Sequence, residues 1–250
     1  MKDLYGKKAI VTGAAQGLGL AMAEGLCSHG VKVCILDISP NLDQTVEDLR
    51  KKDFIVVGLH ADLSDQEQIT NVFNKAVELL DGELDILVNN AGIHKPMPAV
   101  ELPAKDFQRI LDVNVTTVFQ LCRLAAEEMK KKGKGKIINI ASVLSFMGGF
   151  NAAAYSASKG AVAQLTKSLS NEWASEGINV NAIAPGYYVT ELNRHILDDK
   201  ERLDSLVSRI PAGRLGNPEE LAGTVQFLSS NLSNYINGAI IPVDGGFLGR

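Results

Sequence analysis

The sequence has few cysteines and no long apolar run. Its three cysteines, Cys27, Cys34 and Cys122, include no C-x-x-C pair, and its four histidines are too scattered to form a ligand cluster. We therefore expect buried thiols in a reducing compartment and no bound metal. The first apolar run, residues 9–11, is too short for a signal peptide, and no later run approaches the ~18 apolar residues of a membrane helix. These absences predict a cytoplasmic protein with no membrane association.

An excess of positive charge is also absent. The 25 Lys and Arg against 29 Asp and Glu give a net charge of −4, which makes nucleic acids and anionic membranes poor partners. The basic cluster at 130–136 could bind phosphate or an acidic partner, but we interpret it as the solvated end of a helix. No linker, repeat or low-complexity tract divides the 250 residues. The sequence therefore predicts a single domain over residues 1–250.

Short β-branched runs alternate with longer helical patterns along the chain. Because the runs are apolar at nearly every position, they suit strands of a parallel sheet covered by helices on both faces. The predicted fold is therefore a doubly wound, Rossmann-type α/β domain with a seven-stranded parallel sheet. The predicted strands are 8–12, 31–36, 54–58, 85–88, 136–140, 178–183 and 239–243.

A glycine-rich turn lies between the first predicted strand and a helix predicted over 20–29. The turn, Thr12 to Gly19, carries Gly13, Gly17 and Gly19. Glycine permits a tight turn and a close approach of backbone amides to a pyrophosphate, and the helix N-terminus faces the anion. This context favours a dinucleotide site over an ordinary strand-to-helix turn, which remains the alternative.

Asp37 ends the second predicted strand, twenty residues after Gly17. Its carboxylate could accept hydrogen bonds from a ribose 2′-hydroxyl and would repel a 2′-phosphate. The flanking Gln16 and Ile38 are uncharged, so no cation is present to bind that phosphate. NAD is therefore the predicted cofactor, and a turn or cap role for Asp37 is the alternative.

A third pattern places Tyr155 and Lys159 one turn apart at the start of a predicted helix. An ammonium at this spacing would stabilise a phenolate and lower the pKa of the tyrosine, so that Tyr155 could act in proton transfer. Ser142 directly follows the fifth predicted strand and could donate a hydrogen bond to a substrate oxygen.

With these motifs in place, the whole chain resembles the short-chain dehydrogenase/reductase family. The glycine turn matches the TGxxxGxG motif of that family, and Asn89-Asn90-Ala91-Gly92 and Tyr155 to Lys159 match its NNAG and YxxxK motifs. Other matches are Asp62, Asn114, Ser142 and the PGxxxT loop of Pro185-Gly186 to Thr190. No position departs from these motifs.

The resemblance implies a role for each matched residue. Tyr155 would be the general acid or base, Lys159 would tune it and hold the ribose, Ser142 would polarise the carbonyl, and Asn114 would anchor a water that links Lys159 to solvent. The implied cofactor-binding residues are Gly13, Gln16, Gly17, Leu18, Gly19, Asp37, Asp62, Leu63, Asn90, Ala91, Gly92, Tyr155, Lys159, Pro185, Gly186 and Thr190.

The second half of the chain looks most like the subgroup of 2-deoxy-D-gluconate 3-dehydrogenases and gluconate 5-dehydrogenases. This implies an oxidoreductase that transfers hydride between NAD(H) and a secondary alcohol or ketone of a sugar acid. A 3-oxoacyl-[acyl-carrier-protein] reductase shares every catalytic motif and is the alternative enzyme, although Asp37 counts against its usual NADPH. A nucleotide-binding sensor or scaffold with the same fold is the alternative outside the enzymes.

The resemblance also suggests substrate contacts and a homotetramer. The predicted substrate-binding residues are Ser142, Ser145, Tyr155 and Tyr188, with Asn151 and Glu191 as further partners for hydroxyl groups. The candidate cations for a substrate carboxylate are His94, Lys95, Arg194 and Arg209. An apolar stripe of Val118, Leu121, Ala125 and Met129 could pair subunits or could face the sheet of its own chain.

Overall fold

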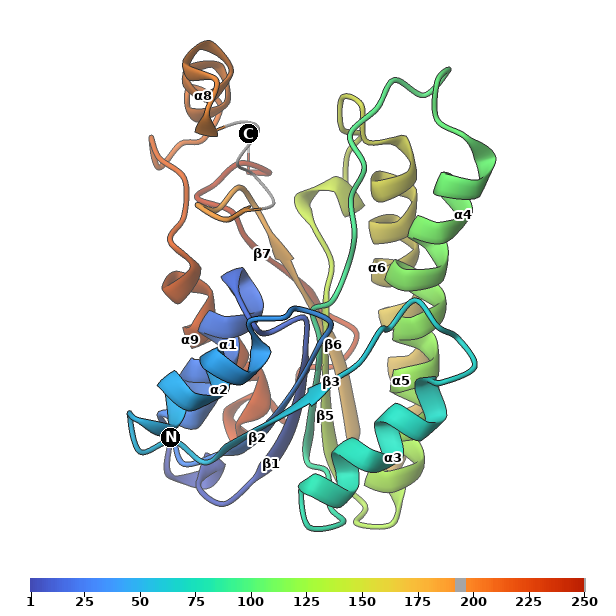
Figure 1. The fold of residues 1–250 in the computed structure, drawn as a ribbon, viewed down its shortest axis with the longest axis vertical. Coiled ribbons are helices and arrows are strands. Elements are labelled where there is room, and N and C mark those ends of the chain that lie inside the picture. Colours follow the sequence, from blue (N-terminus) through green and yellow to red (C-terminus); the bar gives the residue numbers. More distant parts are fainter. Residues whose placement is uncertain (192–196, 250) are drawn as a thin grey trace.

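A sheet of seven parallel strands runs through the middle of the protein, between two layers of helices (Figure 1). The computed structural model describes residues 1–191 and 197–249. Each strand lies within two residues of its predicted range, and the predicted doubly wound fold is confirmed. The strands are β1 (Lys8–Thr12), β2 (Lys32–Asp37), β3 (Val56–His60), β4 (Ile86–Asn89), β5 (Gly135–Ile140), β6 (Ile178–Pro185) and β7 (Ile240–Val243).

The order of the strands creates a crevice at one edge of the sheet. The order is β3-β2-β1-β4-β5-β6-β7, so the chain runs outward in one direction from β1 and in the other from β4. Loops that leave the carboxyl ends of β1 and β4 therefore diverge, and ligands of doubly wound sheets bind at this point. This edge is where the sequence motifs predict the cofactor.

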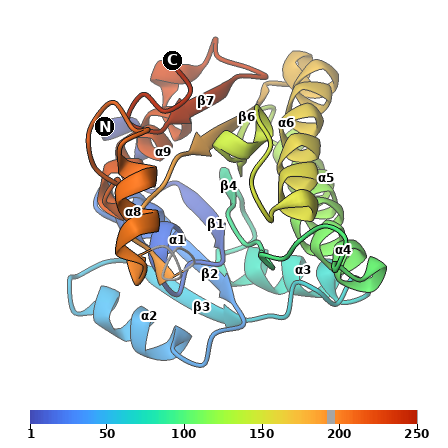
Figure 2. The same ribbon diagram turned by 90° about the horizontal axis from the view of Figure 1, so that it is seen from above.

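Helices cover both faces of the sheet. Figure 2 separates the two layers: α1 and α9 lie on one side of the sheet, and α4, α5 and α6 lie on the other. The helices are α1 (Gly17–Cys27), α2 (Leu42–Arg50), α3 (Ile69–Leu79), α4 (Ala104–Leu111), α5 (Thr117–Lys130), α6 (Ala153–Trp173), α8 (Lys200–Val207) and α9 (Ala222–Ser229). The first helix begins three residues before the predicted start, because the glycine turn itself forms its first turn.

Two apolar clusters form the core, one on each face of the sheet. On the face of α1, Val33 and Ile35 of β2 are fully buried, whereas Cys34 and Leu36 of the same strand are fully buried on the face of α3 and α5. Alternate residues of one strand therefore serve opposite faces, which explains why the strand runs are apolar at nearly every position. Each such aliphatic side chain contributes roughly 1.5–3 kcal/mol on full burial.

The apolar stripe on α5 belongs to this core. Val118, Leu121, Ala125 and Met129 are all less than 5% exposed and pack in the cluster that holds β4 and β5. The stripe therefore faces the sheet of its own chain and gives no support to subunit pairing. The homotetramer stays a prediction.

The basic cluster at 130–136 divides between a helix end and a strand. Helix α5 ends at Lys130, and Gly133 has a φ of +64°, as expected at a helix end. Lys136, however, lies in β5 and is only 6% exposed. The prediction of a solvated helix end is therefore wrong for Lys136, because the strand begins one residue before it.

Candidate functional site

The glycine turn after β1 is held against the loop after β4. Thr12 Oγ1 accepts hydrogen bonds from the backbone N–H groups of Asn90 and Ala91, at 3.0 and 2.9 Å. Asn90 Nδ2 in turn donates to the carbonyls of Thr12 and Gly13, at 2.9 and 2.8 Å. Four hydrogen bonds thus fix the two loops that bound the crevice.

This arrangement requires glycine in the turn. Gly13 has a φ of +62°, and a Cβ there would lie 2.8 Å from Ala91 Cα. A Cβ on Gly19 would collide with the Gly13 carbonyl and would lie 2.8 Å from Ala14 Cα. The backbone can therefore approach a ligand closely only because these positions have no side chain. This cradle fits the pyrophosphate of a dinucleotide at the N-terminus of α1.

A cavity of about 540 Å³ extends from this turn. It is lined by most of the predicted cofactor residues, namely Gly13, Gln16, Gly17, Leu18, Gly19, Asp37, Asp62, Leu63, Asn90, Ala91, Gly92 and Thr190. The other four, Tyr155, Lys159, Pro185 and Gly186, line the neighbouring cavity described below. Leu18, Asn90, Gly92 and Thr190 line both cavities, so the two are adjoining parts of one site.

The carboxylates of Asp37 and Asp62 both line this cavity. Asp37 Oδ2 accepts from the Ala15 N–H at 2.8 Å and its Oδ1 accepts from the Ser39 N–H at 2.9 Å, which fixes the carboxylate at the end of β2. Hydrogen bonds from Ser64 lower the pKa of Asp62. Arg109 of α4, which the sequence analysis did not identify, is the one cation that lines this cavity among the described residues.

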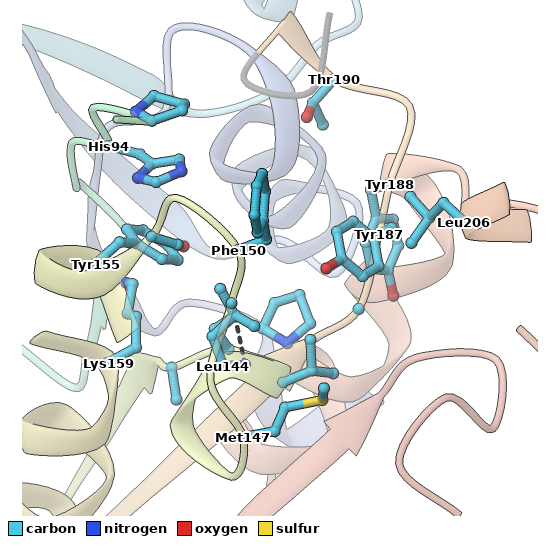
Figure 3. Close-up of a pocket in the computed structure, with 18 of the residues that line it drawn as sticks. His94, Leu144, Met147, Phe150, Tyr155, Lys159, Tyr187, Tyr188, Thr190 and Leu206 are labelled. Atoms are coloured by element: carbon cyan, nitrogen blue, oxygen red, sulfur yellow. Dashed lines mark hydrogen bonds between the residues drawn. The ribbon is translucent and has the colours of Figure 1, made fainter. Parts of the chain in front are cut away.

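The second cavity, of about 330 Å³, contains the predicted catalytic residues. Figure 3 shows Tyr155 and Lys159 on one side and Tyr187, Tyr188 and Leu206 on the other, with Phe150 between them. Tyr155 and Lys159 lie one turn apart near the start of α6, and Lys159 Nζ is 5.6 Å from the centre of the tyrosine ring.

A short helical turn positions Ser142 beside them. Ser142 caps a 3₁₀ turn (Val143–Ser145) and its Oγ accepts from the Leu144 N–H at 3.1 Å. Ser145 Oγ accepts from the Ser142 N–H at 3.2 Å and donates to the Lys159 carbonyl at 2.7 Å. Ser145 therefore connects the Ser142 turn to α6 and does not line this second cavity, although a substrate contact was predicted for it.

Burial dominates the ionisation of the tyrosine and the lysine. It raises the pKa of Tyr155 to about 12, against a smaller opposing effect of the hydrogen bond with Ser142. It lowers the pKa of Lys159 to about 8. The sequence predicts that Lys159 lowers the pKa of Tyr155, but in the protein alone burial of the phenol is the largest effect and the net shift is upward.

Asn114 lies in a π-helical turn (Asp112–Thr116) between α4 and α5. It is fully buried, and its amide donates to the Ile93 carbonyl and to Ser158 Oγ, both at 3.0 Å, and accepts from the Ile93 N–H at 2.8 Å. A Cβ on Gly92 would lie 3.2 Å from Asn114 Oδ1 and 3.7 Å from Lys159 Nζ. The asparagine therefore lies close to the buried lysine, with all of its side-chain polar atoms engaged.

The remaining predicted substrate contacts are distributed over several places. Tyr188 lines the cavity but its hydroxyl donates to the Val243 carbonyl at 3.0 Å, and Glu191 lines only the cofactor cavity. Asn151 lines neither cavity, and its φ of +55° marks it as a turn residue.

The four candidate cations for a substrate carboxylate also lie in different places. His94 lines the cavity with its ring 4.7 Å from that of Tyr155, and Arg209 lines it as well. Lys95 lines neither cavity and pairs with Asp106 at 2.6 Å. Arg194 lies outside the described residues. Arg202 and Tyr187 line the second cavity but were not predicted, since no local motif marks them.

The described ranges, 1–191 and 197–249, contain no helix that is both long and apolar enough to cross a membrane. They also contain no group of three or more His, Cys, Asp or Glu side chains that could hold a metal ion.

The chain is similar to known proteins over its full length. A family model described as enoyl-(acyl carrier protein) reductase matches residues 13–248. A 2-dehydro-3-deoxy-D-gluconate 5-dehydrogenase of Bacillus subtilis (strain 168) is 45% identical over 249 residues, covering 99% of this chain and 97% of that protein. A gluconate 5-dehydrogenase of Gluconobacter oxydans (strain 621H) is 40% identical over 249 residues, covering 98% and 95%.

The chain is also similar in structure to a solved protein. The chain superposes on a gluconate 5-dehydrogenase from Burkholderia cenocepacia J2315, in complex with NADP and tartrate, with a TM-score of 0.94 and 37% sequence identity. The match covers 100% of this chain and 98% of that one.

Proposed function

Because the chain belongs to the short-chain dehydrogenase/reductase family of nicotinamide-dependent oxidoreductases, we propose that it transfers hydride between NAD(H) and a secondary alcohol or ketone of an open-chain sugar acid. The observation that carries the proposal is the convergence of Ser142, Tyr155 and Lys159 on one cavity that adjoins the cavity at the glycine turn. The resemblance to sugar-acid dehydrogenases, drawn from the second half of the sequence, agrees with the similar proteins.

The catalytic roles follow from the positions of these side chains. The nicotinamide, when bound, supplies or accepts the hydride. Tyr155 holds the proton that the substrate oxygen gains or loses, and Ser142 donates a hydrogen bond to the same oxygen. Lys159 uses one N–H on the Ile140 carbonyl, at 2.6 Å, and keeps the others for the ribose and for Tyr155. Asn114 fixes the loop at Ile93 beside this lysine.

NAD is the cofactor that Asp37 favours. A carboxylate at the end of β2 accepts from a ribose hydroxyl and repels a phosphate in the same place. Arg109 lies at the Asp62 side of the cavity and lowers the pKa of that carboxyl, so it is already near an anion. The Burkholderia relative was solved with NADP, so the panel of substrates and cofactors below includes both NAD(H) and NADP(H).

A sugar acid is the substrate class that the cavity favours. Its described lining combines hydroxyl groups with Arg202, Arg209 and Lys159 and includes no Asp or Glu. This lining suits a hydroxylated anion better than a neutral or cationic substrate. The tartrate bound by the Burkholderia relative is an anion of this type.

A substrate and cofactor panel tests the proposal. We expect turnover of 5-keto-D-gluconate, gluconate or 2-keto-3-deoxygluconate with NAD(H), at a kcat/KM at least about 10-fold above that with NADP(H). A preference for NADP(H) would contradict the cofactor assignment. Faster reduction of acetoacetyl thioester than of any sugar acid would instead support the 3-oxoacyl-[acyl-carrier-protein] reductase alternative.

A further inference from the structure

One face of helix α8 turns two arginines toward the substrate cavity. Arg202, Ser205, Leu206 and Arg209 all line the cavity, and their spacing of three, four and seven residues places them on one side of the helix and its continuation. Leu206 is 8% exposed and packs with Val143 and Phe247, which holds this face against the cavity. Figure 3 shows Leu206 across the cavity from Tyr155.

Neither guanidinium is neutralised by a neighbouring acid. Within the described part of the chain, Arg202 and Arg209 form no ion pair, and the Arg209 guanidinium lies 5.0 Å from the centre of the Phe247 ring. Stacking on an aromatic ring orients a guanidinium but leaves its N–H donors free for an anion.

Three acids, Asp199, Asp204 and Asp244, have other partners. Asp199 caps α8 by accepting from the Arg202 N–H at 3.1 Å, and Asp204 pairs with Lys200 at 2.7 Å. Asp244 accepts from the N–H groups of Gly246 and Leu248, both at 2.9 Å. Two cations with no ion-pair partner among the described residues therefore line the cavity, in a protein whose net charge is −4.

These cations lie at the end of the cavity away from the reacting groups. Both arginines act electrostatically on Tyr187, where they oppose the burial that raises its pKa, and Tyr187 in turn acts on Tyr155. Arg202 and Arg209 share one helix face with Leu206, which lies across the cavity from Tyr155 in Figure 3. At the catalytic end, the only described cation of the lining besides a histidine is Lys159, which is buried under the Ile140 carbonyl.

We propose that Arg209, together with Arg202, binds the carboxylate of the substrate, while a carbonyl several carbons away along the chain faces Tyr155 and Ser142. This inference rests on the proposed function, since it assumes a sugar-acid substrate. It assigns the carboxylate to α8 and not to Lys95, which pairs with Asp106 outside the cavity. A consequence is that the reacting carbonyl is distal to the carboxylate, because an α-keto acid would place its carboxylate beside the catalytic groups.

The test compares an anionic substrate with its neutral counterpart in three variants. The substrates are 5-keto-D-gluconate and the ketohexose in which the carboxylate is replaced by a hydroxymethyl group. For Arg209→Met we expect KM for the acid to rise about 10- to 100-fold, the range for a lost hydrogen bond to a charged group, and a further rise for the Arg202→Met/Arg209→Met double variant. Kinetic constants for the neutral ketose should change less than about 3-fold.

Lys200→Met is the matched control. Lys200 is a cation of the same helix, but it pairs with Asp204 and does not line the cavity. Lys95→Met tests the competing cation, and both controls should keep the wild-type preference for the acid. The inference alone is overturned if the double variant still prefers the acid as strongly as wild type, or if it loses acid and ketose equally. If wild-type protein turns over no sugar acid, the proposed function and this inference are both overturned.

Discussion

Lys136 of β5 and Lys159 of α6 are two buried lysines that lie near opposite ends of β5, since Lys159 Nζ donates to the carbonyl of Ile140, the last residue of that strand. They are 6% and 4% exposed, and neither forms an ion pair with any described residue. Burial lowers the pKa of each to about 8. Residue type, burial and pKa are therefore the same at the two ends, yet only the lysine at the carboxyl end of the strand faces the paired cavities of the site.

Their hydrogen bonds explain the difference. Lys136 Nζ donates to Asn179 Oδ1 at 2.9 Å, Ser233 Oγ at 3.3 Å and Asn234 Oδ1 at 2.9 Å, which uses all three N–H groups of an ammonium. Lys159 Nζ donates to one described acceptor, the Ile140 carbonyl. Lys136 also lines a cavity, so a perturbed pKa indicates chemistry only where N–H donors remain for a ligand. Lys136 instead connects β5 to β6 and to the turn at 233–234.

The largest effect is expected from the phenol at the carboxyl end. Tyr155→Phe should lower kcat by about 10²-fold or more while NADH still binds, because only the proton donor is removed. Tyr235→Phe is the control, since Tyr235 is fully exposed. Steady-state kinetics and NADH fluorescence titration measure the two quantities, and an unchanged kcat for Tyr155→Phe would refute its role.

A methyl group in the glycine turn should act on cofactor binding. In Gly19→Ala the new Cβ would collide with the Gly13 carbonyl, and it would lie 2.5 Å from Asn90 Nδ2, so the two loops would have to separate. We expect KM for the cofactor to rise at least about 10-fold. Gly223→Ala in α9 meets no atom within 4 Å and should leave kinetics unchanged. Equal behaviour of the two variants would show that the turn does not hold the cofactor.

Asp37→Ala should change the choice of cofactor more than the rate. Removal of the carboxylate removes both the acceptor for a ribose hydroxyl and the repulsion of a phosphate, so the NAD preference should narrow by about 1–3 kcal/mol. The exposed Asp43, outside the cofactor cavity, provides the control Asp43→Ala. The ratio of kcat/KM for NAD to that for NADP measures the effect, and an unchanged ratio would argue against Asp37.

At the amino end of β5, the expected effect is on stability alone. Lys136→Met leaves three polar partners without their donor and should lower the free energy of unfolding by about 1–3 kcal/mol. Exposed Lys134 provides the control Lys134→Met, with an expected change below about 0.5 kcal/mol. Denaturant unfolding of both variants measures the difference, and equal stabilities would contradict the role given to Lys136.

The same variant gives a pH dependence with a definite sign. The pKa of Lys136 is about 8 in the folded protein and near 10.5 when unfolded, so between these values the unfolded chain binds more protons. The free energy of unfolding contributed by this group therefore rises with pH over this window. The stability of wild type relative to Lys136→Met should increase from below pH 8 to above pH 10.5. A relative stability that falls with pH would contradict the assigned burial.

Local motifs predicted the sheet, and they identified residues that the structure brings together around one cavity, because each motif depends on neighbouring residues. The strand runs and the glycine turn carry their own periodicity and conformational requirements. Lys136 could not be predicted, since its acceptors come from residues about 40 and 100 positions later in the chain. Arg202 was missed for the same reason: α8 is polar in sequence, and only the packing of Leu206 turns one face toward the cavity.

Ser145 and Tyr188 were predicted to contact the substrate, but their hydroxyl groups have other acceptors in the structure. Both lie near the catalytic residues in sequence or in space, which favoured a substrate contact. The structure instead gives Ser145 the Lys159 carbonyl as an acceptor and Tyr188 the Val243 carbonyl. Proximity along the chain predicts that a polar residue is near the site, but the direction of its hydroxyl depends on acceptors that only the folded backbone provides.

The most direct test of the comparison between the two ends of β5 is kcat/KM for sugar-acid turnover in Lys159→Met and Lys136→Met, measured side by side with circular dichroism as a check of folding. The kcat/KM of Lys159→Met should fall by about 100-fold or more, since contacts to both the ribose and Tyr155 are lost. The kcat/KM of Lys136→Met should stay within about 2-fold of wild type. Equal losses in the two folded variants, or a larger loss for Lys136→Met, would contradict the assignment of chemistry to the carboxyl end alone.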